Sequence, residues 1–501
     1  MRRSLHLISA AFTSQLLVAQ ALDPGFGDAG IAIHDLGQAE RVFDAGLDAS
    51  GRILVAGNTE PEDDENDFLL ARFNSDGTLD ASFGSGGWLV AAEFGVQTSA
   101  AAVAEQADGR ILALGWRSTG AISRCFVRRY MPDGVLDPAF GSAGEWESDL
   151  NDRENPAALG LLPDGRILVG GARILASGVT RPFVYRLNAN GTLDAAFGSN
   201  GATEVPFGAG FHSFGDMVVH ADGRITISGN TAFSSAFLAR FEANGSPDAS
   251  FDADGLLLIE DSPAVEEAWR MAMRADGRIV AAVGRYGSVG EVWLYLVDED
   301  GSLLPYGGTA GVNSMVAADW YIADLELDAA ERALMPGYVI GSPIDQGVLC
   351  RAVDAAPDLS FGTNGTVVLP ITENPAARKL LQRPDGRVLV VGHGAQADND
   401  ELDVWMVQYA NLPAAIGERA LGSPLRVMPN PVHEALTIRS DEPIANSAAL
   451  SVRDMTGREV FAEADRRIDH VIVDASRLPA GAYTVTISTN EGQRTARFIK
   501  Q

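Results

Sequence analysis

Short apolar runs separated by glycine-containing turns recur along most of the chain, with no apolar stripe of helical spacing between them. One unit shows the pattern in four runs, at residues 88–94, 99–106, 111–116 and 125–130. Runs of this length, bounded by turn residues, predict β-strands. Between the second and third runs, Asp108-Gly109 predicts a tight hairpin, because glycine accepts the positive φ that short hairpins require. The unit therefore predicts a four-stranded antiparallel sheet.

Two motifs repeat in step with these strands. The first, LDxxFGxxG, places an aromatic residue at intervals of 57, 57, 57, 54, 55 and 55 residues: Phe26, Phe83, Phe140, Phe197, Phe251, Tyr306 and Phe361. The second, DGRIxxxG, occurs in full or nearly so at residues 50–57, 108–115, 164–171, 222–229, 276–284 and 385–392, with a degraded copy at 330–341. Each motif therefore has seven copies.

Seven such sheets can bury apolar faces that one sheet alone cannot, if they pack radially around a ring. An open β-solenoid is the alternative repeat architecture, but its units are shorter. We predict an all-β fold, a seven-bladed β-propeller with four-stranded antiparallel blades over residues 22–410. The alternating motifs also resemble those of the bacterial delta-60 repeat family. That resemblance implies a β-propeller and no established activity. The sixth unit departs from the family pattern, because Leu303 stands in place of the motif aspartate.

The last 76 residues carry a different pattern. After a linker at 411–425, alternating runs and glycine turns over residues 426–501 predict a small β-sandwich. The Pro429-Asn430-Pro431 entry, a turn at Gly457, the sequence LPAGAY and a basic end resemble the type A C-terminal sorting domain of the type IX secretion system. The resemblance implies that the type IX machinery is a partner, bound through this segment. It also implies an extracellular or outer-surface location.

Residues 1–21 predict a cleaved signal peptide. Arg2 and Arg3 precede an apolar stretch, and Ala19-Gln20-Ala21 offers the small residues that a signal peptidase needs. No later run has the ~20 consecutive apolar residues of a membrane span, so we expect no integral membrane segment after cleavage. Cleavage would leave Leu22 at the start of the first LDxxFGxxG motif. The first strand is then available to complete the last blade and close the ring.

Composition and charge exclude one class of partner. An apolar content of 46% permits a sizeable core. The net charge is −29, and because residues 426–501 hold ten basic and ten acidic residues, the acidic surplus lies in the predicted propeller. An acidic surface repels phosphate backbones, so we expect no nucleic-acid partner.

The aspartate of LDxxFGxxG lies three residues before the aromatic residue, and an arginine precedes that residue by ten or eleven. A carboxylate and a guanidinium at a fixed offset suit an ion pair that fixes a turn. Calcium loops, one per blade, are the functional alternative, but the spacing is not that of an EF-hand. We interpret the motif as a structural joint with these pairs: Arg72 and Asp80, Arg129 and Asp137, Arg186 and Asp194, Arg240 and Asp248, Arg351 and Asp358.

The two repeated motifs must lie on one face of a propeller, which we call the uniform face. The opposite, variable face carries loops that differ from unit to unit, and varied loops on a rigid scaffold are where binding usually resides. Two of these loops, at 59–67 and 393–403, are acidic and belong to units that adjoin in a closed ring. They predict a patch able to hold Ca²⁺, with solvated loops as the alternative: Asp63, Asp64, Glu65, Asp398, Asp400 and Glu401.

Enzymatic signatures are sparse. The propeller sequence has four histidines, His34, His212, His220 and His393, and neither HExxH nor GxSxG. The two cysteines, Cys125 and Cys350, fall in the last strands of units 2 and 6, three blades apart around the ring, so we predict two buried free thiols. We expect no catalytic residues and no cofactor other than Ca²⁺. The predicted function is a secreted binding or structural module for a glycan or protein. The alternative is an exported propeller glycosidase or lyase, whose scattered carboxylates a sequence cannot pair.

Overall fold

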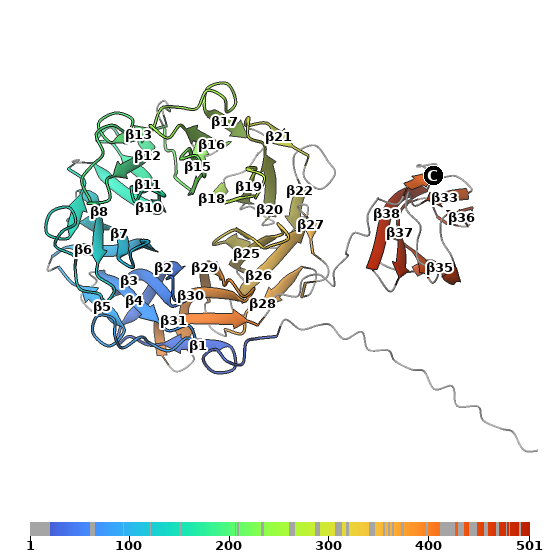
Figure 1. Ribbon diagram of the computed structural model, residues 1–501, viewed down its shortest axis with the longest axis horizontal. Coiled ribbons are helices and arrows are strands. Elements are labelled where there is room, and N and C mark those ends of the chain that lie inside the picture. Colours follow the sequence, from blue (N-terminus) through green and yellow to red (C-terminus); the bar gives the residue numbers. More distant parts are fainter. Residues whose placement is uncertain are drawn as a thin grey trace, which may run out of the picture. The chain divides into compact units, whose positions relative to one another are not determined.

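Every regular element in the described part of the computed structural model is a β-strand (Figure 1). The structure describes residues 21–60, 66–93, 95–120, 122–149, 152–205, 207, 210–231, 235–259, 266–285, 291–305, 313–316, 320–339, 346–353, 356–358, 361–362, 365–371, 375–396, 399–410, 426–428, 435–439, 448–454, 459–466, 470–476, 478–479, 481–489 and 492–500. The chain divides into two compact units, residues 1–412 and 413–501. The predicted signal peptide up to residue 20 and the linker at 411–425 lie outside the described residues.

The strands of the first unit form antiparallel meanders arranged in a ring (Figure 1). Blade 1 holds β2 (Ala39–Leu47), β3 (Ile53–Glu60), β4 (Asp67–Phe73) and β5 (Trp88–Ala91); blade 2 holds β6 (Gln97–Glu105), β7 (Ile111–Ser118), β8 (Ser123–Tyr130) and β9 (Glu145–Glu147); blade 3 holds β10 (Arg153–Leu161), β11 (Ile167–Ile174), β12 (Thr180–Leu187) and β13 (Ala202–Glu204). The described strands of these blades run from the ring centre outwards in that order.

The remaining meanders follow the same plan. Blade 4 holds β14 (Asp216–Val219), β15 (Ile225–Thr231), β16 (Ser235–Phe241) and β17 (Leu256–Ile259); blade 5 holds β18 (Glu266–Met273), β19 (Ile279–Arg285), β20 (Glu291–Val297), β21 (Leu303–Leu304) and β22 (Asn313–Val316); blade 6 holds β23 (Trp320–Ile322), β24 (Glu326–Leu327), β25 (Ala333–Val339), β26 (Gln346–Val353), β27 (Ala356–Pro357) and β28 (Thr366–Val368); blade 7 holds β29 (Ala376–Gln382), β30 (Val388–Gln396), β31 (Asn399–Tyr409) and β1 (Ile31–His34). The prediction of an all-β propeller is confirmed.

The blades differ from the sequence units in one respect. The strand that follows LDxxFGxxG is not the first strand of a new blade but the outermost strand of the preceding one, as β5 pairs with β4. The motif is therefore a corner between the third and fourth strands of one blade. The assignment of all four strands of a blade to one sequence unit was wrong. The reason is that the length of the repeat does not show at which connection one blade ends and the next begins.

The same offset closes the ring. Strand β1 pairs antiparallel with β31, from Ile31 opposite Val407 to His34 opposite Val404, so the N-terminal segment completes the last blade (Figure 1). The Asp23 amide also donates to the Gln408 carbonyl at 2.8 Å. The closure expected from the position of the first motif is present.

The corner built by LDxxFGxxG is a charged joint around a buried ring. In the second copy, Phe83 is fully buried, the Arg72 guanidinium lies 4.7 Å from its centroid, and Arg72 Nε lies 2.7 Å from Asp80 Oδ2. Asp80 Oδ1 accepts the Ser82 amide at 3.0 Å, so both carboxylate oxygens are used. Gly84 has φ of 53°, and a Cβ there would lie 2.5 Å from the Trp88 carbonyl oxygen.

The joint recurs with the same geometry. The five predicted arginine–aspartate pairs have Nε–Oδ2 distances of 2.7–2.8 Å. In four of them an Nη1 also donates to a carbonyl of the next blade's corner. The structural interpretation of the motif is confirmed: it links neighbouring blades.

Cys125 in β8 and Cys350 in β26 are buried free thiols, as predicted. The second unit contains two antiparallel sheets. One holds β32 (Arg426–Met428), β33 (Ala435–Arg439) and β36 (His470–Asp474), and the other holds β34 (Ala448–Asp454), β35 (Glu459–Arg466), β37 (Gly481–Thr489) and β38 (Gly492–Lys500). Leu450, Val452 and Val485 are buried in this unit.

Candidate functional site

The acidic patch predicted from the variable loops falls largely outside the described residues. This holds for Asp63, Asp64, Glu65 and Asp398, while Asp400 and Glu401 belong to β31 without a description of their side chains. The strands that flank these loops belong to blades 1 and 7, which are neighbours through contacts of β2 with β29 and β31. The patch remains a prediction.

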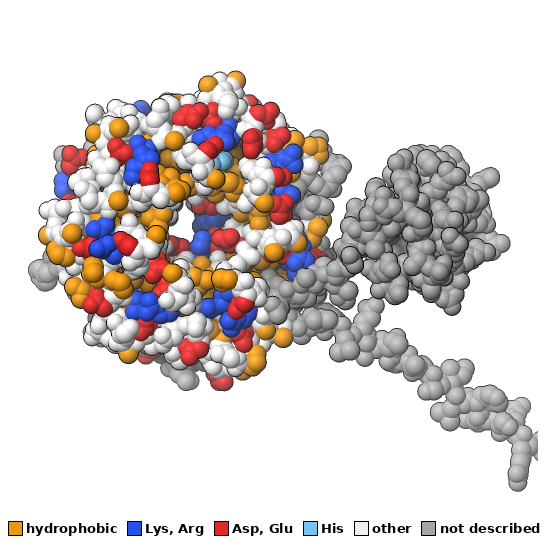
Figure 2. Space-filling view, viewed as in Figure 1, with side chains coloured by type: hydrophobic (Ala, Val, Ile, Leu, Met, Phe, Trp, Pro, Cys, Tyr) orange, Lys and Arg blue, Asp and Glu red, His pale blue; other side chains and the backbone are white. Residues whose placement is uncertain are grey.

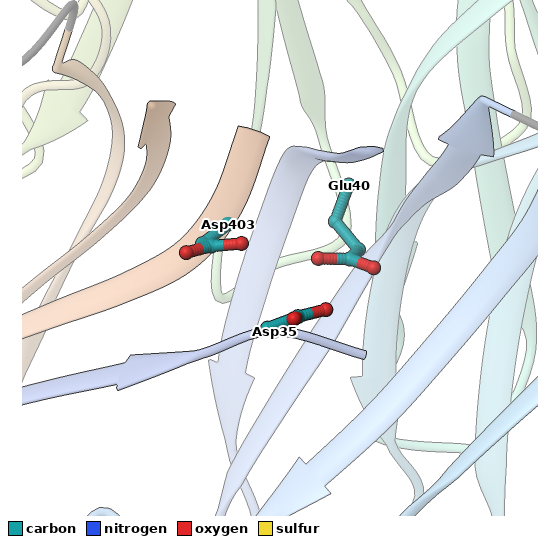
Figure 3. Close-up of side chains that lie close together, drawn as sticks. All are labelled: Asp35, Glu40 and Asp403. Carbon is teal, nitrogen blue, oxygen red and sulfur yellow. The ribbon is translucent and has the colours of Figure 1, made fainter. Parts of the chain in front are cut away.

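A different acidic cluster lies between the same two blades. Asp35 follows β1, Glu40 is the second residue of β2, and Asp403 lies in β31. Their carboxylates point toward one another, and one oxygen from each lies within 4.8 Å of the others (Figure 3). We call these three residues the acidic triad. It lies toward the variable face, since β1 ends there and β2 begins there.

The triad is open on one side and enclosed on the other. Asp35 is exposed, whereas Glu40 has no exposed surface and Asp403 is buried. Asp35 Oδ1 accepts the Gly37 amide at 2.6 Å, which holds the turn between β1 and β2. The neighbouring Arg41 is paired with Glu60, with Nη2 and Oε2 3.2 Å apart.

Glu40 is the electrostatic centre of the cluster. Its Oε1 accepts the Gln38 amide at 3.1 Å, and its Oε2, fully enclosed, has no hydrogen-bond partner among the described residues. Burial raises the pKa of Glu40 to about 8, against the opposing effects of the Gln38 and Leu36 amides, and the charges of Asp35 and Asp403 add to the rise. The carboxylates can hold a proton or a cation in this space.

Sequence patterns gave no direct indication of the triad. Asp35 and Glu40 lie outside the acidic runs, Asp403 is the last residue of the run at 393–403 but was not among the predicted ligands, and none of the three belongs to a repeated motif. The available indication was ring closure, because the segment after β1 must then meet the last blade. Charge density along the chain led instead to the loops at 59–67 and 393–403.

The histidines have structural partners where the structure describes them. His393 Nδ1 accepts the Val42 amide at 3.1 Å, and burial lowers the pKa of His393 to about 3. His34 Nε2 lies 2.7 Å from the Gly77 carbonyl, and His220 Nε2 lies 2.8 Å from Thr226 Oγ1. His212 stacks on Phe207 with ring centroids 4.5 Å apart. Each of the four histidines therefore has a hydrogen-bonding or packing neighbour within the propeller.

A second group of charges lies around the central opening, where Figure 2 shows acidic and basic side chains together. Lys379 Nζ lies 3.1 Å from Asp324 Oδ1. Although burial alone would lower it, the pKa of Lys379 is raised by Asp324 and other nearby carboxylates. Burial and repulsion from Asp324 raise the pKa of Glu326 to about 7.

The acids of this group also fasten innermost strands to one another. Three aspartates each accept a backbone amide from the next blade, at 3.0, 2.8 and 2.9 Å: Asp44 from Val103, Asp216 from Met271, and Asp324 from Leu380. Amide acceptance across these three blade boundaries gives the three carboxylates a structural role.

A cavity of about 1020 Å³ lies at the outer rim of blades 2 and 3, and the corner after β16 of blade 4 also lines it. Its lining includes Trp146, Tyr185 and Arg173. The two aromatic rings meet edge to face with centroids 5.6 Å apart, and Arg173 pairs with Glu204. The wall of the cavity therefore contains two aromatic rings and an arginine that is already paired with a glutamate.

Two family models match the chain. The domain of unknown function DUF5122, described as a β-propeller, matches residues 49–83, 106–140, 162–197 and 220–251. A secretion system C-terminal sorting domain matches residues 426–501. The chain carries DUF5122 β-propeller repeats and a type IX sorting domain. Secretion and a cell-surface location follow from that sorting domain, which links the protein to the secretion machinery.

Curated proteins give no significant sequence match. Similar solved structures include the polysaccharide lyase Uly1, at 11% identity and a TM-score of 0.44, covering 77% of this chain and 93% of the lyase. Drosophila Semaphorin 1a, extracellular domains 1–2, has 10% identity and a TM-score of 0.43, covering 78% of this chain and 90% of the other. The NanB sialidase from Streptococcus pneumoniae has 10% identity and a TM-score of 0.38, covering 74% and 68%. At such low similarity we draw no functional conclusion from them.

No helix among the described residues is long and apolar enough to cross a membrane.

Proposed function

We propose that the protein is a non-enzymatic module that binds an extracellular glycan or protein through the variable face of its propeller. The observation that carries this proposal is the contrast between the two faces. On the uniform face, the motif aspartates are each engaged by arginines and local amides, as Asp80 is by Arg72, Arg52 and Ser82. The connections on the opposite face share no such motif.

Export supports the same function. A sorting domain directs the chain to the cell surface or the extracellular space, where a rigid ring with varied loops suits recognition. The acids of the central opening accept backbone amides between blades, which favours a structural role for them over a catalytic one.

The proposal is tested by probing the full-length protein against glycan and extracellular-protein arrays, followed by two matched variants. D63N/D64N/E65Q removes three charges from the acidic loop predicted for the variable face. D108N/D164N/D222N removes three from exposed hairpins of the uniform face. We expect the first variant to lose binding at least severalfold and the second to retain it.

Equal net charge in the two variants separates a local contact from general electrostatic attraction. Loss of binding in the uniform-face variant alone would contradict the proposed face. Release of reducing or unsaturated sugar ends from an array ligand would instead identify a polysaccharide-cleaving enzyme.

A further inference from the structure

At three junctions between blades, one side chain occupies the same position in the innermost strand, but its surroundings differ at the closing junction. Glu40, Thr98 and Glu154 are each the second residue of an innermost strand, two residues before a register shift in the pairing with the next strand. This shared position allows a direct comparison of what each side chain contacts.

At two of the junctions the side chain accepts an amide from the preceding blade. The Phe68 amide donates to Thr98 Oγ1 at 3.0 Å, and the Cys125 amide donates to Glu154 Oε2 at 3.1 Å. Glu154 also accepts hydroxyl hydrogen bonds from Ser148 and Tyr185, the latter at 2.6 Å. A buried glutamate is thus surrounded by donors.

At the closing junction the surroundings of the glutamate are acidic. Glu40 faces Asp35 and Asp403, and its enclosed Oε2 has no hydrogen-bond partner among the described residues (Figure 3). An ionised carboxylate buried beside two others is costly unless a positive charge compensates it. The neighbouring Arg41 is directed to Glu60 instead.

We propose that Asp35, Glu40 and Asp403 bind one Ca²⁺ ion, which holds the N-terminal segment against the closing blade. The three residues come from the segment after β1, from β2 and from β31, so a shared ion connects blade 7 to blade 1. Exposed Asp35 leaves a path for the ion and for water ligands.

The donor set favours Ca²⁺ over other common cations. All three side chains offer oxygen, whereas Zn²⁺ sites in proteins are built mainly from sulfur and nitrogen ligands. The near histidine, His393, uses Nδ1 to accept the Val42 amide. Mg²⁺ requires a compact, near-ideal octahedron and retains most of its water, while Ca²⁺ accepts six to eight oxygens in a flexible arrangement. Three carboxylates with water can supply such a set.

The experiment measures Ca²⁺ binding to the chelator-treated full-length protein by isothermal titration, together with the rise in melting temperature. We expect a Kd of about 10⁻⁴ M or tighter. The variant E40Q should bind one Ca²⁺ fewer per chain and lose its share of the thermal rise. D35N, at the exposed edge, provides a second variant that does not alter the buried side.

Two controls locate the site. E60Q removes a nearby carboxylate outside the triad, and D63N/D64N/E65Q removes three carboxylates of the acidic loop at 59–67. Both variants should retain the triad ion. Absence of Ca²⁺ binding to the native protein would overturn the proposal, as would an unchanged stoichiometry in both E40Q and D35N. Loss of all binding in the loop variant alone would assign the ion to the acidic loop and also overturn it.

Discussion

Glu40 and Glu154 occupy the same position in two innermost strands, but their surroundings are opposite. Glu154 joins blade 3 to blade 2 and receives one amide and two hydroxyl hydrogen bonds. Glu40 lies where blade 1 meets blade 7 and faces two aspartates. One of these, Asp403, is equivalent in position to Arg124 of blade 2. Asp403 lies two residues before Trp405, which pairs with Gly392. Arg124 lies two residues before Phe126, which pairs with Gly115.

The difference shows that a repeated fold fixes positions but not the chemistry at them. Junctions within the chain join consecutive blades, whereas the closing junction brings together segments from the two ends of the propeller. The corner motif changes there too. Gln408 replaces the strand arginine beside Asp23, with Nε2 and Oδ2 2.7 Å apart, and Arg387 supplies the guanidinium at 2.8 Å.

The largest expected effect tests the closing junction as a whole. Deletion of residues 22–36 removes β1, the Asp23 corner, the fully buried Phe26 and one member of the acidic triad. We expect the melting temperature to fall by about 10 °C or more. Deletion of residues 426–501, in the other compact unit, is the control and should leave the propeller transition in place. An unchanged melting temperature after the first deletion would contradict a stabilising role for the closure.

The next prediction compares a corner between consecutive blades with the corner at the closing junction. Arg240 is buried, lies 2.7 Å from Asp248 and covers Phe251, whereas the side chain of Arg387 at the closing corner is 36% exposed. R240A should cost about 3–5 kcal/mol of unfolding free energy, because it leaves a buried carboxylate poorly paired. R387A should cost about 1 kcal/mol or less. Denaturant unfolding of both variants measures the difference, and equal losses would refute it.

A smaller expected effect distinguishes Glu154 from Glu40: replacement by glutamine should lower the unfolding free energy at Glu154 but not at Glu40. In E154Q an NH₂ group replaces one of the two oxygens that together accept three donors, so we expect a loss of about 1–3 kcal/mol. In E40Q the new amide can donate to Asp35 or Asp403, so the calcium-free protein should be equally or more stable at pH 7. Denaturant unfolding in the presence of a chelator tests both. A loss of stability in calcium-free E40Q would show that Glu40 has partners like those of Glu154.

Repetition explains how far the sequence predicts this structure. The pairing of Arg72 with Asp80 and the burial of Phe83 were predictable because the same spacing recurs along the chain. The buried thiol of Cys125 followed from its strand position. Glu40 was not predictable in this way, because its neighbours are set by the closure of the ring and not by a motif. In the sequence, a single glutamate at the second position of a strand looks like an ordinary strand residue.

The smallest effect is a difference in pH dependence between E40Q and the native protein without calcium. Burial raises the pKa of Glu40 from 4.5 to about 8 in the folded state, so the folded protein holds a proton there that the unfolded chain releases. Stability from this group is therefore fully present below pH 4.5 and is lost as the pH rises through about 8. Between pH 6 and 7 the native protein should lose about 1 kcal/mol relative to E40Q.

Other groups are controlled by that comparison. His393, whose pKa is lowered to about 3, does not titrate in this window, and Glu326, with a pKa raised to about 7, is present in both proteins. Saturating Ca²⁺ should reduce or reverse the loss in the native protein only, since an ion that replaces the proton stabilises ionised Glu40. Parallel pH curves for the two proteins would mean that Glu40 is ionised and already compensated, as Glu154 is compensated by its donors, and the contrast between the two junctions would then disappear.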